Sequence, residues 1–270
     1  MTFKNLFPSL IVLIWTACAL FGSYLPLAPN LIDLDQILVS PVAHSWAGFD
    51  ELGRPVLDRL IVGARTSFLV AVSVVLVAGV FGTACGIVSA WFGGIVDHVV
   101  VRIMDVVLAF PGMLLAIALA GLLGPGLDNL VIALVAVGWV SFARLARAQS
   151  LSIKSREHVL AARALGVSTP LILFRHVLPL TLAPLIVEAT FGLGAAIVAE
   201  AGLSFLGLGV QPPNASWGIM IQQGADYMLV APHLVVAPAV IMVLVVLSLN
   251  VLGDALHDRL DVTRELAAAV

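Results

Sequence analysis

Two carboxylates, Glu188 and Glu200, lie in a stretch that is otherwise without charge from residue 177 to residue 225. A carboxylate on an apolar helix is costly to bury in lipid, so each should face the protein interior, a water-filled passage or a partner subunit. Glu188 lies about two turns inside its predicted helix and is expected to line a substrate path. For Glu200, nearer the outer surface, both a structural contact and a place in that path stay open.

A serine and a histidine suggest an enzymatic alternative. Gly202-Leu203-Ser204-Phe205 is faintly similar to the serine motif of rhomboid proteases, and His233 opens a later apolar segment as a base would. An intramembrane serine protease is therefore one alternative, although Phe205 stands where that motif has a second glycine. A secondary transporter is another, but it needs its own ion-coupling site and usually internal repeats, and we find neither.

The sequence contains neither the residue pattern of a metal site nor that of a nucleotide-binding site. The six histidines never pair at a spacing of three or four, so no helical metal site is expected. Cys18 and Cys85 each lie in an apolar run, which argues against a disulfide or thiolate site. A phosphate-binding P-loop needs a lysine directly after glycine, whereas the two lysines follow Phe3 and Ile153. ATP is thus not expected to be hydrolysed by this chain.

The composition is that of a membrane protein. Of 270 residues, 61% are hydrophobic and 11% are charged, against about 25% charged in soluble domains. The mean hydropathy is +1.12. A net charge of -3 excludes the clustered basic surface that nucleic-acid binding requires.

Charge-free intervals of about 20 residues predict six transmembrane helices. They are 6–27, a segment within 66–96, 106–123, 127–146, 180–201 and 231–252. Pro111 and Gly112 should kink the third. The first is too long for a signal h-region and is expected to be retained. Gly82 and Gly86, four apart, are expected to let two helices approach closely, within this chain rather than as a dimer motif.

The positive charges predict the orientation. With the N-terminus inside, ten of the thirteen lysines and arginines fall on the cytoplasmic side. The other three, Arg54, Arg59 and Arg65, fall in the first outer loop. Positive residues favour the cytoplasm, so both termini are expected there. The outer segment from Gly202 to Met228, with Trp217 as an interfacial anchor and a short helix from Ile219, should join 50–65 in receiving a substrate-binding protein.

The longest cytoplasmic loop predicts a helix-turn-helix. Ser155 would cap a helix over 156–165, Gly166 would take the left-handed position that ends it, and a second helix would run from Ser168 to His176. Pro179 would separate the pair from the fifth span. Such a surface, displaying Ala161, Ala162, Arg156 and Arg163, suits docking into a groove on a partner.

These residues carry a family resemblance. Ala161-Ala162, Gly166 and Leu178-Pro179 stand at the spacing of the EAA loop of ABC-importer permeases, and residues 161–166 are close to the dipeptide, oligopeptide and nickel branch. Other blocks that resemble this branch are 50–54, 109–112, 199–213 and 250–254, so the resemblance covers about 44–261. One departure is Leu160, which replaces the glutamate that names the motif; Glu157, one turn earlier, is the candidate to serve instead.

The resemblance implies an all-α membrane protein with the ABC type I importer permease fold, one domain over 1–270 with a coupling loop at about 148–178. It implies a permease subunit of an importer of peptides or nickel in the bacterial inner membrane. The implied partners are a second homologous permease, two ATPase subunits that hold ATP and Mg, and an extracytoplasmic binding protein. The residues expected to couple to the ATPase are Glu157, Ala161, Ala162, Arg163, Gly166 and Pro179.

Overall fold

The computed structural model describes residues 3–42 and 45–260, and the predicted cytoplasmic C-terminal segment beyond 260 lies outside them. The described residues form helices joined by irregular segments, and their only β-structure is two isolated bridges near residues 42–55. The helices are α1 (Phe3–Phe21), α2 (Val56–Phe92), α3 (Gly94–Leu108), α4 (Gly112–Leu123), α5 (Leu127–Lys154), α6 (Glu157–Ala164), α7 (Thr169–Ile172), α8 (Leu178–Phe205), α9 (Trp217–Ala225) and α10 (His233–Leu260).

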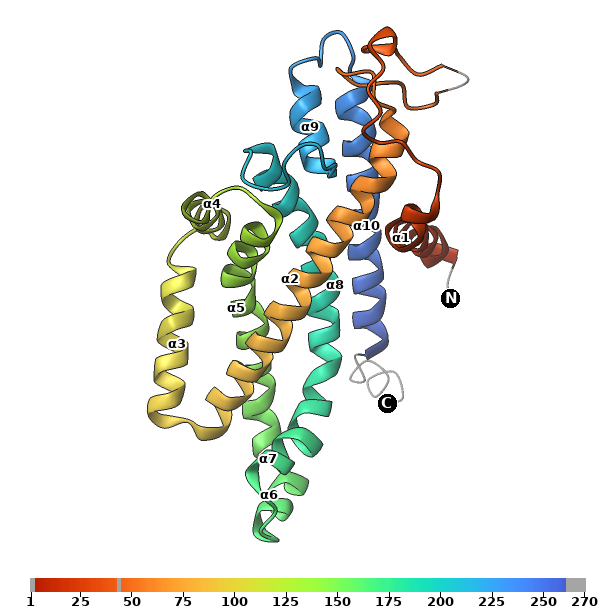
Figure 1. The fold of residues 1–270 in the computed structure, drawn as a ribbon. Helices are drawn as coiled ribbons and strands as arrows, with labels where there is room; N and C mark the ends of the chain where they lie inside the picture. Colours follow the sequence, from red (N-terminus) through yellow and green to blue (C-terminus); the bar gives the residue numbers. More distant parts are fainter. Residues whose placement is uncertain (1–2, 43–44, 261–270) are drawn as a thin grey trace.

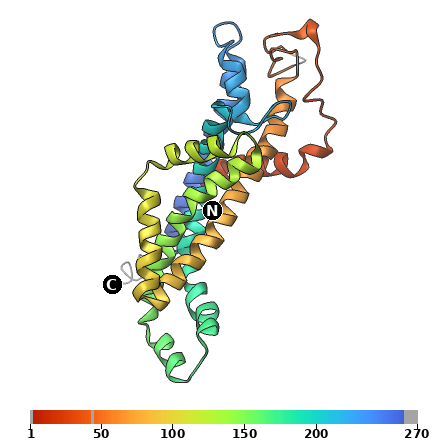
Figure 2. The ribbon, with the colours of Figure 1, turned by 60° about the vertical axis from the view of Figure 1, so that its left-hand side comes forward.

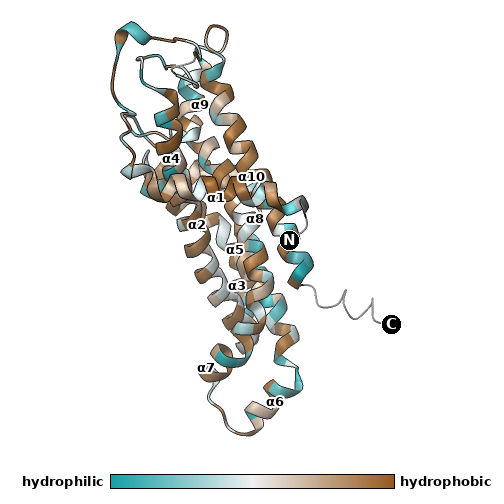
Figure 3. Cartoon of the chain, turned by 90° about the vertical axis from the view of Figure 1, so that its right-hand side faces the viewer, coloured by the Kyte–Doolittle hydropathy of each residue, from teal (hydrophilic) through white to brown (hydrophobic). Residues whose placement is uncertain are grey.

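Four long helices, α2, α5, α8 and α10, run along the length of the molecule (Figure 1). α6 and α7 protrude at one end of the molecule, which we call the α6 end. The opposite end, called the α9 end, holds α9 and the long segment between α1 and α2. α4 lies across the bundle, as the turned view in Figure 2 shows. The ribbon is mostly hydrophobic along the long helices and more hydrophilic at the two ends (Figure 3).

The described residues contain five or six candidate membrane spans, which agrees with the predicted six, but their limits differ. Five helices are long and apolar enough to cross a membrane, and the bent pair α3 and α4 is a sixth candidate when it is counted as one span. That pair is bent by 88°, so the predicted break at Pro111 is real but divides two full helices. The third span therefore begins at Gly94, because Asp97, Arg102 and Asp105 are carried on a helix rather than in a loop.

α2 is much longer than the predicted second span. Its 37 residues extend about 55 Å at 1.5 Å per residue, beyond a hydrocarbon layer of about 30 Å. Arg59 and Arg65 thus lie on α2, not in a loop. The predicted spans missed this extension because charged residues were counted as loop.

The contact between α2 and α5 is the most extensive of any helix pair in the described chain. Two glycines of α2 set the distance between the two helix backbones. A Cβ atom on Gly82 would lie 2.3 Å from the carbonyl oxygen of Trp139, and one on Gly86 would lie 2.3 Å from that of Ala143. The predicted close approach within the chain is confirmed. Other residues of α2 and α5 line the cavity described below.

Candidate functional site

The α5–α8 loop, residues 155–177, forms a compact helical hairpin at the α6 end (Figure 2). α6 and α7 are held by buried Val159, Ile172 and Val177, which join the core formed by α2 and α5. The predicted cap is wrong: Arg156 is the N-cap of α6, and the Ser155 hydroxyl instead donates to the Ser152 carbonyl. The start of α6 therefore has no side-chain cap, and buried apolar residues hold the loop against α2 and α5.

Gly166 has the predicted left-handed conformation, with φ of +75°. Its N–H donates to the carbonyl of Arg163 at 3.0 Å, and the N–H of Val167 donates to the carbonyl of Ala162 at 3.1 Å. This pair of bonds is a Schellman motif, which closes the C-terminus of α6 and turns the chain toward α7.

The predicted docking residues divide into two groups. Glu157, Ala161, Arg163 and Pro179 are exposed, whereas Ala162 is buried against the loop's own core. Ala162 therefore supports the hairpin and is not on its surface. Apolar residues that the motif did not single out complete the exposed face. They are Leu160, Leu165 and Phe174, of which Leu165 is 83% exposed.

Pro179 was predicted to separate the helix pair from the fifth span, but it does not. α7 continues through a π-helical turn, Leu173–Val177, into α8, where Leu178 donates to the carbonyl of Leu173. Pro179 lies in the first turn of α8, where a missing N–H is tolerated. The hairpin is thus joined to the fifth span by continuous helix.

Contacts missed from the sequence tie the hairpin to the end of α2. The Arg163 guanidinium lies 5.3 Å from the centre of the Trp91 ring. The Lys154 ammonium donates to the carbonyls of Ala90, at 3.2 Å, and Trp91. Nearby, Arg147 on α5 makes two 2.6 Å bonds to Asp97 on α3. The spacing of these residues, from 50 to 72 positions, left no local signal.

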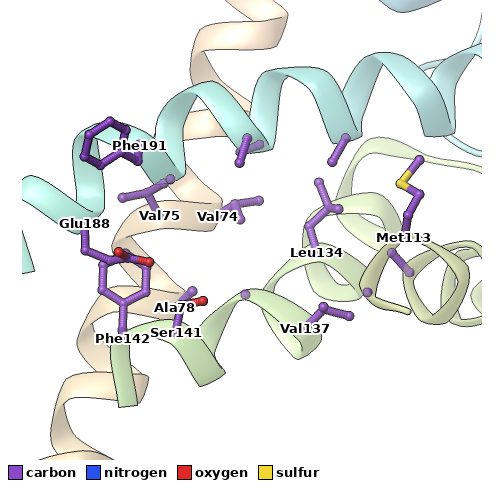
Figure 4. A pocket seen from close by; sticks show the side chains of 17 residues that line it. Val74, Val75, Ala78, Met113, Leu134, Val137, Ser141, Phe142, Glu188 and Phe191 are labelled. Atoms are coloured by element: carbon purple, nitrogen blue, oxygen red, sulfur yellow. The ribbon is translucent and has the colours of Figure 1, made fainter. Parts of the chain in front are cut away.

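A cavity of about 340 Å³ lies between α2, α4, α5 and α8, and Glu188 faces it (Figure 4). Its walls are apolar except for Glu188 and Ser141. Glu188 lies at one end and Met113 at the other. The expectation that Glu188 faces an internal space agrees with this position.

Glu200 is placed differently. It is fully buried and does not line the cavity. Its carboxylate accepts from Ser67 on α2 at 3.0 Å, from Ser204 on α8 at 2.7 Å, and from Ser216 at the start of α9. Glu200 therefore joins three helices, which favours the structural reading.

The hydrogen bonds of Ser204 and His233 argue against the serine-protease alternative. Ser204 is fully buried and donates to Glu200, while the His233 ring nitrogen lies 3.4 Å from the carbonyl of Phe49. Each is thus engaged by a different partner, and no serine–histidine pair forms.

The predicted outer docking surface is partly wrong. Asp50, Arg54 and Arg59 are at most 5% exposed. Asp50 accepts from Arg54 at 2.7 Å and lies 3.4 Å from Arg59, which also donates to Gln223 on α9. These contacts fasten α9 to α2 and to the segment that precedes α2. Trp217 is likewise buried, with its indole N–H on the carbonyl of Leu60, so it is not an interfacial anchor.

Comparison with known proteins identifies the family. Residues 82–263 match the model for the binding-protein-dependent transport system inner membrane component. This chain belongs to that family. It is 39% identical over 254 residues to the glutathione transport system permease protein GsiD of Pectobacterium atrosepticum, covering 93% of this chain and 84% of the relative. It is 42% identical over 224 residues to the dipeptide transport system permease protein DppC of Alkalihalophilus pseudofirmus, covering 83% and 74%.

The fold agrees with that assignment. A chain of the inward-facing MetNI methionine ABC transporter superposes with a TM-score of 0.62 at 19% identity, covering 76% of this chain and 98% of that one. The protein is a multi-pass inner-membrane permease subunit and not an enzyme, and ATP is bound by separate subunits of the importer. The protease and secondary-transporter alternatives are therefore wrong.

Proposed function

We propose that this chain, one domain over 1–270, is one of two permease subunits in an ATP-driven importer of short peptides, either dipeptides or glutathione. The observation that carries the proposal is its identity of about 40% to a glutathione and a dipeptide permease over most of their lengths. Nickel, the other expected cargo, gains no support from these relatives. The proposed partners are a second homologous permease, two ATPase subunits and an extracytoplasmic binding protein.

The α5–α8 loop is the proposed contact with an ATPase subunit. It protrudes from the bundle, and its exposed apolar and basic side chains suit a groove on a partner. Glu157, Ala161 and Arg163 would touch the ATPase, while Ala162 and Gly166 would set the shape of the hairpin. Pro179 would begin the helix that carries the motion into the membrane.

An ATPase contact at the α5–α8 loop implies an orientation of the chain in the membrane, which we also propose. The α6 end lies in the cytoplasm with both termini, in accord with the positive charges. The α9 end then faces the binding protein. Because Asp50 and Arg54 are buried, the proposed contact there is the turn after α9, where Leu229 is fully exposed and Val230 is 74% exposed.

The test is uptake by the complete complex in vesicles. Radiolabelled alanyl-alanine and glutathione are supplied with the binding protein, with ATP inside and ADP as the control. We expect ATP-dependent accumulation of one of the two. The complex must first be shown to hydrolyse ATP when the loaded binding protein is added. If such an active complex accumulates neither alanyl-alanine nor glutathione, the peptide assignment is overturned.

A further inference from the structure

The cavity has a single charged group, and that group lacks a partner. Glu188 is half-buried, and within residues 3–42 and 45–260 no side chain or backbone N–H donates to its carboxylate. A carboxylate without a partner is unfavourable in apolar surroundings, and an ionisable residue on a membrane-spanning helix marks a candidate functional site. Glu200 provides the contrast, since serines satisfy it on three helices.

The wall that carries Glu188 is built for a small, extended molecule. The α8 side chains that line the cavity recur at helical spacing, on one face of α8. They are Glu188, Phe191, Gly192, Ala195, Ala196 and Ala199. From residue 188 to residue 199 the helix rises by eleven steps of 1.5 Å, about 16 Å in all. Four of these six residues are glycine or alanine, which leaves room along the wall beyond the carboxylate.

We infer that Glu188 binds the protonated amino group of the transported molecule as it passes through this cavity. A free α-amino group has a pKa of about 8 and carries a positive charge at neutral pH. Both proposed cargoes, a dipeptide and glutathione, have one such group. An ammonium–carboxylate pair would balance the one charged side chain among the described residues that line the cavity, and the apolar part of the wall would contact the apolar groups of the peptide.

This inference rests on the proposed function and makes Glu188 a specificity-determining residue for cargo with a free amine. It predicts that removing the carboxylate charge and removing the amine charge have the same consequence, so the two changes are not additive. A carboxylate that only supports the fold, or that pairs with the second permease, would not distinguish an amine from an amide.

The experiment uses the whole permease–ATPase complex in lipid nanodiscs, without the binding protein, so that only contacts inside the complex count. Binding of radiolabelled alanyl-alanine and glutathione is measured alongside their N-acetyl forms, in the native complex and in Glu188→Gln. We expect Glu188→Gln to weaken binding of the free amines at least tenfold, about 1.4 kcal/mol, and to leave the acetylated forms unchanged. Asp128→Asn, which removes an exposed carboxylate outside the cavity, is the matched control.

Several results would overturn the inference. One is that Glu188→Gln weakens binding of the free and the acetylated forms equally, or weakens binding of neither. Another is that the native complex binds neither free amine. A further one is that the Glu188→Gln complex loses the second permease. The last would make Glu188 a contact between subunits. Uptake of a peptide by the native complex, measured separately, keeps the proposed function standing if the amine contact fails.

Discussion

Gly166→Val tests whether the α5–α8 loop is the coupling element. Gly166 has φ of +75°, and its two turn-closing bonds direct the chain from α6 to α7. Valine disfavours this conformation because its branched Cβ crowds the backbone. The turn must then either stay strained or open, and an open turn moves α7 relative to α6.

The expected magnitude follows from the surroundings of the glycine. No atom lies within 4 Å of a Cβ built on Gly166, so the substitution adds backbone strain without a clash. The left-handed conformation costs a non-glycine residue about 1–2 kcal/mol. Such an energy lowers the population of the native turn roughly 5- to 30-fold relative to alternatives.

Gly207 offers a matched control. It also has φ of +75° with no atom within 4 Å of its Cβ position, and it ends α8 with the same pair of bonds at the α9 end. Gly207→Val therefore introduces the same backbone strain far from the proposed ATPase contact. Any general loss of folding caused by the strain should appear in both variants.

The assay is recovery of the ATPase subunits with the tagged permease, together with ATP hydrolysis stimulated by the loaded binding protein. We expect Gly166→Val to insert normally, to recover less ATPase and to lose stimulated hydrolysis, while Gly207→Val keeps ATPase recovery. Native coupling in Gly166→Val, or equal loss of ATPase in both variants, would refute the role of this loop.

Three further outcomes are expected. Gly82→Ala should lower the thermal stability and the yield of the subunit, because its new Cβ would meet the α5 backbone at 2.3 Å, whereas Gly79→Ala, at 3.5 Å from a ring, should not; equal yields and melting temperatures would contradict the packing. Glu200→Leu should lower the melting temperature in detergent, because each buried serine hydroxyl left without an acceptor costs about 1–3 kcal/mol; Glu200→Gln, which retains one oxygen, should fall between it and the native protein. A reporter active only in the cytoplasm should work after Leu165 and fail after Leu229, and activity at both sites would reject the orientation.

Much of the architecture could be predicted because it depends on local sequence. A charge-free run of about 20 residues already indicates a membrane span, and the bend next to Pro111 was expected from that proline and the adjacent glycine. Gly166 was predictable for the same reason, since a glycine after a helical segment commonly takes the left-handed position. The resemblance in 161–166 then led to the family that the comparison established.

The limits of the elements were less predictable. The end of a span was inferred from the nearest charge, yet α2 carries Arg59 and Arg65 on continuous helix beyond the apolar run. Pro179 was read as a break, but the π-helical turn Leu173–Val177 leads directly into α8, and the helix continues past the proline. Charge and proline therefore mark polarity and strain, and not the end of a helix by themselves.

The sequence alone determined that two glutamates lie on an apolar helix and that each needs a polar or functional setting. Only the tertiary structure decided which setting each receives. Glu200 meets Ser67, 133 residues away, while Glu188 meets no donor in the described chain and faces the cavity. The physical reason is that hydrogen bonds depend on which side chains come within about 3 Å, and the spacing of residues along one helix does not say which side chain of another helix each will meet.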